Sequence, residues 1–226
     1  MSESVKRVVL VSASPKVDQN EAVSAFLDAR GEGLLVGEGI EVVTIPVRKA
    51  LIHHESKTAF DTLQNADAIV MIFPLYFFCL PAMLTRFLQD FAAAYPAAKH
   101  AASVYAIINC GFPEPEINEE AMRVIECFSL QTGRRFQGGV MVGCGGMLLG
   151  AAQAPFMLPV FGQIDSLFAR VKRDVLSGTP EEAQIINIAP KFPRWMYFVA
   201  GNAGWRAMAR KHQVKPRELN NTPYQR

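Results

Sequence analysis

Short apolar runs rich in β-branched residues alternate along this chain with longer stretches of helical periodicity. The apolar runs begin near Val8, Val42, Ile69, Val104 and Val140, 27 to 36 residues apart. Between and after them, apolar residues recur at helical spacing. We expect helices over residues 21–35, 56–65, 82–95, 119–132 and 162–177. Strands and helices that alternate at this spacing predict a parallel sheet with helices on both faces.

The apolar runs also indicate how deeply the strands are buried. Val8-Val9-Leu10-Val11 and Ile69-Val70-Met71-Ile72 contain no polar residue, which is typical of strands that helices cover on both sides. Five such strands match a doubly wound sheet with the order 2-1-3-4-5. We therefore predict an α/β fold built on one five-stranded parallel sheet.

Composition and charge divide the chain into two parts. Half of the 226 residues are apolar and 19% are charged, as in globular proteins. The sequence Ser-Gly-Thr-Pro at 177–180 predicts the end of the last helix of the sheet domain. We therefore expect a domain over 1–178 and a helical or irregular basic extension over 179–226. Residues 190–226 hold eight Lys and Arg against one acid, whereas the remainder holds 15 against 20. The C-terminal residues therefore form a separate basic segment.

Membrane and metal classes are disfavoured by the sequence. The two long uncharged stretches, 68–85 and 136–164, are interrupted by prolines and glycines, so neither predicts a membrane-spanning helix. The first residues are polar and no signal-peptide pattern follows, so we expect a cytoplasmic protein. The four cysteines form no C-x-x-C pair and no metal-ligand spacing with histidine, which indicates reduced thiols and no metal site.

The first candidate binding loop, 12–20, joins the first strand to the first helix. Its small and hydroxyl residues let backbone N–H groups converge on an anion, and the helix dipole and a lysine add favourable charge. The candidate contacts are Ser12, Ser14, Lys16, Gln19 and Asn20. A simple turn with Asp18 or Asn20 as helix cap is the commoner alternative for such a loop alone. The loop is neither G-x-G-x-x-G nor a P-loop, which disfavours an NTPase or a dinucleotide-binding fold.

The second candidate loop, 74–81, is aromatic and uncharged and ends the third strand. Flat ligands bind at the carboxyl ends of strands in open α/β sheets. The candidate contacts are Pro74, Leu75, Tyr76 and Phe77. The alternative is that Phe73, Phe77 and Phe78 simply fill the core, as aromatic residues usually do.

The third candidate loop, Asn109-Cys110-Gly111, follows the fourth strand. A glycine at this position lets the backbone approach a planar ligand closely, although an ordinary turn is the alternative. In the predicted strand order, strands one, three and four are adjacent. The three loops should therefore meet at one edge of the sheet, which strengthens three individually weak signals.

Two of these loops resemble motifs of the NAD(P)H-dependent FMN reductases and related quinone or nitroreductases of the flavodoxin-like superfamily. Residues 13–21 are similar to the family pattern Gly-Ser-Pro-Arg-x-x-Gly-Asn-Ser. The segment from Pro74-Leu75-Tyr76 through Pro81 to Asp90 is similar to the pattern Pro-x-Tyr, four residues, Pro-x-x-Leu-Lys-x-Phe-x-Asp. The resemblance covers residues 6–177, and the second motif is the more specific.

The resemblance implies an FMN site in these loops. It places the phosphate near Ser14, Lys16 and Asn20, and the flavin ring near residues 75–77 and 109–111. Ala13, Gln19 and Glu21 depart from the family pattern, and Glu21 stands where a hydroxyl residue would bind phosphate. A carboxylate beside a phosphate dianion is repulsive unless it points to solvent.

The implied activity is that of an FMN-dependent NAD(P)H oxidoreductase. NADPH or NADH would pass hydride through flavin N5 to a quinone, a nitroaromatic or a free flavin, and no side chain would act as nucleophile or base. Two alternatives remain. One is a one-electron flavodoxin-type carrier, and the other is a flavin-free membrane-peripheral or interaction module.

The basic extension bears on possible partners. Residues 195–205 are aromatic and uncharged, and basic residues flank them. This pattern suits packing on the domain itself or on a partner subunit, and it also suits a peripheral contact with a membrane surface. We expect a homodimer or higher homo-oligomer. A nucleic-acid partner is disfavoured because the rest of the chain is net acidic.

Overall fold

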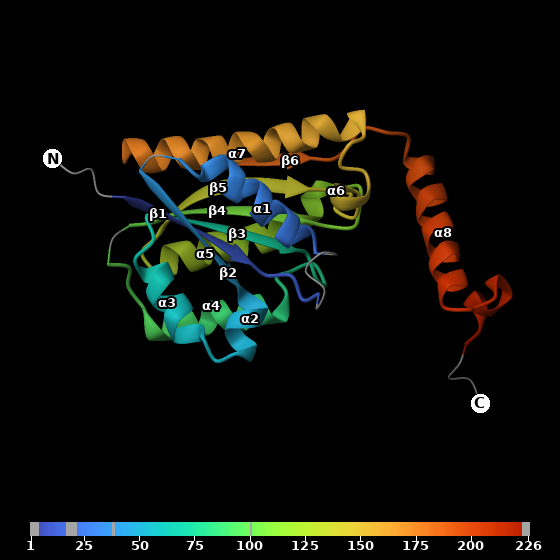
Figure 1. The fold of residues 1–226 in the computed structure, drawn as a ribbon, viewed down its shortest axis with the longest axis horizontal. Helices are drawn as coiled ribbons and strands as arrows, with labels where there is room; N and C mark the ends of the chain where they lie inside the picture. The colour runs from blue at the N-terminus through green and yellow to red at the C-terminus, as the bar shows by residue number, and fades with distance from the viewer. Residues whose placement is uncertain (1–4, 17–21, 38, 100, 223–226) are drawn as a thin grey trace. The chain divides into compact units, whose positions relative to one another are not determined.

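The computed structural model describes residues 5–16, 22–37, 39–99 and 101–222 (Figure 1). The chain divides into two compact units, Met1–Pro190 and Lys191–Arg226.

A six-stranded parallel sheet forms the centre of the first unit. Its strands are β1 Lys6–Ser12, β2 Ile40–Pro46, β3 Ala68–Pro74, β4 Ser103–Asn109, β5 Arg135–Val142 and β6 Gln184–Ile188. Their order across the sheet is β2-β1-β3-β4-β5-β6, and every neighbouring pair is parallel. The predicted α/β class and the order of the first five strands are confirmed.

The sixth strand extends the predicted sheet. We expected five strands and assigned residues after 178 to the extension, but β6 pairs with Gly138–Val142 of β5. Gly138 allows this approach, since its φ is +80° and a Cβ there would lie 2.1 Å from the Gln184 carbonyl oxygen. The strand is five residues long and largely solvent-accessible, so it lacks the continuous apolar run that marked the others.

Helices cover both faces of the sheet (Figure 1). They are α1 Val23–Leu35, α2 Val47–Ile52, α3 Ser56–Gln64, α4 Ala82–Ala94, α5 Glu119–Gln131, α6 Met147–Gly150 and α7 Leu158–Ser177. Short 3₁₀ helices span Pro115–Asn118 and Pro155–Met157. The five predicted helices are present. The two that we did not predict, α2 and α6, have six and four residues and are too short to show a period.

Alternate residues of strands β1 to β5 enter two separate cores. Val9 and Val11 of β1 pack with α3, α4 and α5 on one face, whereas Val8 and Leu10 pack with α1 and α7 on the other. Both sets are fully buried, which is why the strands read as unbroken apolar runs. The loops that follow the carboxyl ends of the strands all lie at one edge of this parallel sheet.

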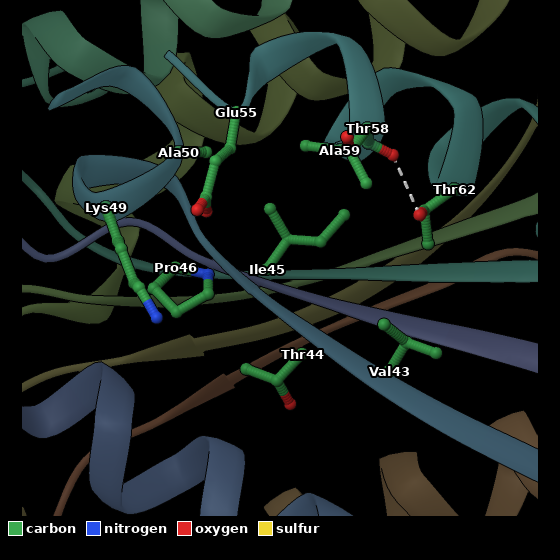
Figure 2. Close-up of a pocket in the computed structure, with 10 residues that line it drawn as sticks. All are labelled: Val43, Thr44, Ile45, Pro46, Lys49, Ala50, Glu55, Thr58, Ala59 and Thr62. Carbon is green, nitrogen blue, oxygen red and sulfur yellow. Dashed lines mark hydrogen bonds between the residues drawn. The ribbon is translucent and has the colours of Figure 1, made fainter. Parts of the chain in front are cut away.

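The edge strand β2 borders an open hollow on the α2–α3 side of the sheet (Figure 2). The hollow has a volume of about 440 Å³. Lys49 and Glu55 extend into it beside Ile45 and Pro46, and the Thr62 hydroxyl donates to the Thr58 carbonyl, 2.9 Å away. Both charged side chains are exposed, so water can solvate them.

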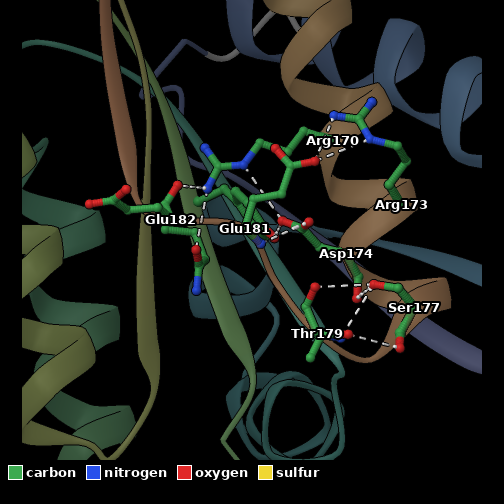
Figure 3. A network of polar contacts seen from close by, with 9 residues as sticks. Arg170, Arg173, Asp174, Ser177, Thr179, Glu181 and Glu182 are labelled. Atoms are coloured by element: carbon green, nitrogen blue, oxygen red, sulfur yellow. Dashed lines mark hydrogen bonds and ion pairs between the residues drawn. The ribbon is translucent and has the colours of Figure 1, made fainter.

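A buried ion pair fastens the connection between α7 and β6 (Figure 3). Arg170 Nε lies 3.6 Å from Asp174 Oδ2, and the two side chains are 7% and 2% exposed. The Tyr105 hydroxyl donates to the same carboxylate oxygen at 2.6 Å. Arg170 also donates to the Glu182 carbonyl at 2.8 Å, and the Glu181 N–H donates to Asp174 Oδ1 at 3.2 Å. These bonds hold the segment that leads into the sixth strand.

The second unit consists mainly of α8, Arg194–Lys211, followed by a 3₁₀ helix over Pro216–Asn220. The aromatic segment predicted as helical or irregular is therefore a helix. Trp195 and Trp205 are 65% and 68% exposed, so the rest of this unit does not bury them. No helix in the described part of the chain is both long and apolar enough to cross a membrane.

Candidate functional site

The loops after β1, β3 and β4 are joined by backbone hydrogen bonds at one edge of the sheet. Ala13 N donates to the Ile72 carbonyl at 3.0 Å, and Leu75 N donates to the Asn109 carbonyl at 2.7 Å. The Asn109 amide also donates to the Phe73 carbonyl at 3.3 Å. The strand order reverses direction between β1 and β3, so these loops border the point where open α/β sheets bind ligands.

The loop after β1 has a buried beginning and an exposed lysine. Ser12 and Ser14 are buried, and the Ser14 hydroxyl oxygen accepts a hydrogen bond from Lys16 N at 3.2 Å. Lys16 is exposed. Two predicted contacts, Gln19 and Asn20, lie outside the described residues, as do Asp18 and Glu21.

Among the described residues, no side chain caps the start of α1. The N-cap position is Ala22, whose side chain has no oxygen that could accept from the first turn. The first three N–H groups of a helix have no partner within it, and the helix dipole makes them attractive to an anion. This end of α1 therefore offers donors beside Ser14 and Lys16.

A strained two-residue turn follows β3. Tyr76 and Cys79 exchange two backbone hydrogen bonds of 2.9 Å, and between them Phe77 and Phe78 have φ values of +47° and +61°. Positive φ at both central residues is the geometry of a type I′ turn, which favours Asn and Gly. The left-handed conformation costs roughly 1–2 kcal/mol for each other residue. Strain of this kind persists most often at functional sites.

The turn presents its aromatic rings to solvent. Phe77 is 97% exposed and Phe78 is 61% exposed, whereas Phe73 is fully buried. The alternative prediction, that all three fill the core, is therefore right for Phe73 and wrong for the other two. Phe78 stacks on Phe112 of the next loop, with ring centroids 6.2 Å apart and an interplanar angle of 14°. Pro74 and Leu75, at the end of β3 and just beyond it, are half-buried.

The loop after β4 is held by the loop after β5. Asn109 and Cys110 are buried, and Cys110 N donates to the Val142 carbonyl at 2.9 Å. Gly145 N donates to the Cys110 carbonyl at 2.6 Å, and a Cβ on Gly145 would lie 2.5 Å from Asn109 Oδ1. Gly111 is different, because a Cβ there would meet nothing within 4 Å. The backbone at Gly111 is therefore open on its outer side.

The thiols at this edge are held in their neutral form. Burial raises the pKa of Cys110, and burial first and then the proximity of Cys110 raise the pKa of Cys144 to about 11. A thiol is nucleophilic and redox-active chiefly as the thiolate. These two cysteines therefore act as packing residues.

A second polar feature at this edge was not predicted from the sequence. Asp28 of α1 is only 5% exposed, and its burial raises its pKa from 3.8 to about 7. It lines a cavity of about 570 Å³ beside Ser12 and Ser14. The signal in the sequence is a polar pair, Ser24 and Asp28, one turn apart on the face of α1 that meets the sheet.

The comparisons with known proteins find similarity at the level of structure. No family model and no curated protein matches the chain. An NADH:FMN oxidoreductase in its apo form superposes with a TM-score of 0.58 at 17% identity, over 79% of this chain and 96% of that one. A flavone reductase gives 0.56 at 9% identity, over 80% and 66% of the two chains. An NADPH-quinone reductase from P. pentosaceus gives 0.52 at 13% identity, over 74% and 97%.

The fold is flavodoxin-like. The sequence identities are low, so the similarity establishes the fold alone. Any function has to be argued from the residues of this chain. In a flavodoxin-like sheet the ligand site lies at the reversal between β1 and β3. The three loops described above border that reversal.

Proposed function

We propose that this protein is an FMN-dependent NAD(P)H oxidoreductase. The observation that carries the proposal is the convergence of two unlike surfaces at the β1–β3 reversal. One is the start of α1 beside Ser14 and Lys16, whose N-cap residue Ala22 supplies no side-chain oxygen, and the other is an uncharged, strained aromatic turn at residues 76–79. A ligand with an anionic end and a flat ring matches both surfaces.

The loop after β1 would hold the phosphate of FMN. Lys16 supplies a positive charge, and the hydroxyl of Ser14 and the first N–H groups of α1 supply donors. Ser12, Gln19 and Asn20 complete the proposed set of contacts. No buried carboxylate among the described residues of this loop opposes an anion.

The loops after β3 and β4 would hold the flavin ring. The two hydrogen bonds of the turn use the N–H groups of Tyr76 and Cys79, which leaves those of Phe77 and Phe78 outside the turn. Such donors stabilise negative charge on a reduced ring. Leu75 and Tyr76 would flank the ring, and Asn109, Cys110 and Gly111 would contact it from the neighbouring strand, where the backbone at Gly111 is open.

The reaction would need no side-chain nucleophile. Bound FMN supplies hydride acceptance from NADH or NADPH and passes the electrons to an acceptor such as a quinone, a nitroaromatic or a free flavin. The chain binds and orients the cofactor and keeps its buried thiols neutral. The exposed Phe77 leaves an apolar surface on which a second flat molecule can lie.

A one-electron carrier on the same fold is the alternative for this site. Such carriers resemble one another in a threonine-rich phosphate loop and a strongly acidic surface, and this chain has neither. Anaerobic addition of NADPH separates the two functions. An oxidoreductase bleaches its own flavin absorbance under these conditions, whereas a carrier does so only when a reductase is added.

The phosphate half of the proposal is tested by Lys16→Ala. A charge-assisted hydrogen bond contributes about 1.5–3 kcal/mol, so FMN affinity should fall roughly 10- to 100-fold. Lys57→Ala is the matched control, because Lys57 is an exposed lysine of α3 that pairs with Asp61. Fluorescence titration with FMN measures both variants. Equal affinities for Lys16→Ala and the control would place the phosphate elsewhere.

A further inference from the structure

The cavity beside Asp28 adjoins the phosphate half of the proposed flavin site, because Ser12 and Ser14 of the first loop also line it. Its other walls are formed by α1, the end of β2 and α2. Its volume of about 570 Å³ falls in the range of small-molecule sites. Asp28 and Glu32 line it from α1, and Arg48 and Lys49 line it from α2.

Asp28 is a buried acid with an unused oxygen. Burial raises the pKa of Asp28, and a hydrogen bond from Ser12 lowers it by a smaller amount. The other carboxylate oxygen, Oδ1, has no hydrogen-bond partner. Ser24, one turn earlier and wholly buried, also has an unpartnered hydroxyl. A buried polar atom without a partner costs about 1–3 kcal/mol. Asp28 is one of the residues that line the cavity, so a hydroxyl group of a ligand there can donate to its carboxyl.

The charges on the two walls have opposite sign. The Glu32 carboxylate accepts a hydrogen bond from the Thr44 hydroxyl at 2.5 Å, which holds a second acceptor on the α1 wall. Within the described residues, Arg48 and Lys49 form no ion pair. Carboxylates accept from hydroxyl groups, and arginine binds phosphate with paired donors. The cavity therefore suits a molecule with hydroxyl groups on one side and a phosphate on the other.

The hollow on the opposite face of β2 does not share this property. It also contains Lys49, and its acid is Glu55 (Figure 2). None of the residues that line it has a buried side-chain atom without a hydrogen-bond partner. Of the two hollows, the one on the α1 side of β2 is therefore the better candidate for a ligand site, because a residue with a buried, unpartnered oxygen lines it.

We infer that the cavity between α1, β2 and α2 binds a ribonucleoside phosphate, namely the adenosine half of the nicotinamide dinucleotide. Asp28 and Glu32 accept from the ribose hydroxyl groups, and Arg48 and Lys49 bind the phosphate. This inference rests on the proposed function, since it names the part of the chain that holds the coenzyme. Because the pKa of Asp28 is about 7, its carboxyl is partly protonated at neutral pH. A protonated carboxyl can donate a hydrogen bond as well as accept one, which suits a hydroxyl partner.

The position of the cavity agrees with this assignment. It opens at the carboxyl end of β2, two strands from β3 and three from β4. Neighbouring strands lie about 4.8 Å apart, so roughly 10–15 Å separate the end of β2 from the loops after β3 and β4, where the flavin ring would lie. An extended dinucleotide can place its nicotinamide at those loops while its adenosine half lies in the cavity.

The direct test is calorimetric titration with ADP-ribose, which lacks the nicotinamide. The full-length protein is used both loaded with FMN and free of flavin. We expect Asp28→Ala and Arg48→Ala each to weaken binding at least tenfold, and Lys57→Ala to bind like the wild type. Arg48 is only half-buried, so this variant tests the cavity even if Asp28→Ala folds poorly. Absence of binding, or equal affinities in all four proteins, would overturn the inference.

Kinetics with two hydride donors identify the source of the ribonucleotide. For NADPH, both cavity variants should raise KM at least tenfold. For reduced nicotinamide mononucleotide, which lacks the adenosine half, KM and kcat should stay unchanged. If the variants weaken binding of AMP but leave the KM for NADPH unchanged, the cavity serves a free nucleotide and the coenzyme assignment is wrong.

Failure of the proposed function is distinguishable from failure of this inference. A protein that never binds FMN contradicts the oxidoreductase proposal. The titration of flavin-free protein with ADP-ribose still reports on the cavity in that case.

Discussion

Phe77 and Phe78 hold backbone conformations that glycine and asparagine adopt more easily. Their φ values are +47° and +61°, in a turn closed by two hydrogen bonds between Tyr76 and Cys79. The chain tolerates this strain although Phe77 contributes almost no burial. Aromatic rings at these positions are therefore best explained by a ligand at the turn.

Replacement of the pair by the sequence that the turn prefers should separate stability from binding. We expect Phe77→Asn/Phe78→Gly to raise the free energy of unfolding by up to about 2–4 kcal/mol, because strain of about 1–2 kcal/mol is relieved at each of two residues. The same variant should bind FMN more weakly, because the rings are lost. Urea unfolding and flavin titration measure the two effects, and a variant that is both less stable and fully competent in FMN binding contradicts this account of the turn.

Asp28 gives the stability of the unliganded protein a distinctive pH dependence. Its pKa is about 7 in the folded chain, against 3.8 for a fully solvated aspartate, and burial is the main cause, with a smaller contribution from Glu32. Between these two pH values the folded state binds more protons than the unfolded state. The free energy of unfolding should therefore fall as pH rises from about 4 to about 7, by up to about 4 kcal/mol.

Asp28→Asn removes this titration while keeping the size of the side chain. We expect the variant to be more stable than the wild type at pH 8 and to lose that advantage toward pH 4. Urea unfolding across this range measures the difference. A difference that does not change with pH would show that the carboxyl is ionised in the folded state as it is in the unfolded chain.

At the scale of elements, the sequence predicted the strands that are buried along their whole length. Val8–Val11 and Ile69–Ile72 are buried on both faces, so their apolar runs reveal both the strands and their parallel arrangement. Strand β6 is held instead by Gly138 and by the polar network around Arg170, which act through backbone approach and long-range hydrogen bonds. Neither effect leaves a periodic pattern in the sequence.

The same reasoning applies to the candidate site. The sequence predicted the loops, because prolines, glycines and strand ends mark them. It left open whether Phe77 contacts a ligand or fills the core, since the direction of this side chain depends on the closed turn and its positive φ. Nor did it predict the cavity at Asp28, which forms only when α1 and α2 pack around β2.

Removal of one member of the Arg170–Asp174 pair should destabilise the fold strongly. Asp174→Ala leaves the Arg170 guanidinium buried without its carboxylate and removes the acceptor of the Tyr105 hydroxyl. Loss of one member of a buried pair costs about 3–5 kcal/mol. We expect a loss of this size in urea unfolding, and a smaller loss for Asp174→Asn, which keeps an acceptor. Glu120→Ala, which breaks an exposed pair with Arg123, is the control and should cost under about 1 kcal/mol.

At the scale of the whole molecule, the two units differ in charge. Residues 191–226 carry a net charge of +7, and the remainder carries −5. In the second unit α8 exposes Trp195 and Trp205, and basic side chains flank this aromatic stretch. Aromatic and basic residues in one helix favour contact with an anionic membrane surface, where each Lys or Arg contributes about 1 kcal/mol.

We expect the full-length protein to sediment with phosphatidylglycerol vesicles at low salt and to be released as salt is raised. Trp195→Ala/Trp205→Ala should reduce this association at least tenfold and leave FMN affinity unchanged. If the wild-type protein does not sediment with the vesicles, the membrane contact is contradicted, and contact of the tryptophans with another protein surface is the alternative. Size-exclusion chromatography of the same two proteins would then show whether a second copy of the chain covers them.

The central claim is that three loops at one edge of this sheet bind FMN for reaction with a reduced nicotinamide. The most direct measurement is the visible absorption spectrum of the protein loaded with FMN, before and after anaerobic addition of NADPH or NADH. We predict a bound flavin spectrum that bleaches without any added reductase. A protein that retains no FMN, or whose bound flavin stays oxidised with both nucleotides, would contradict the account.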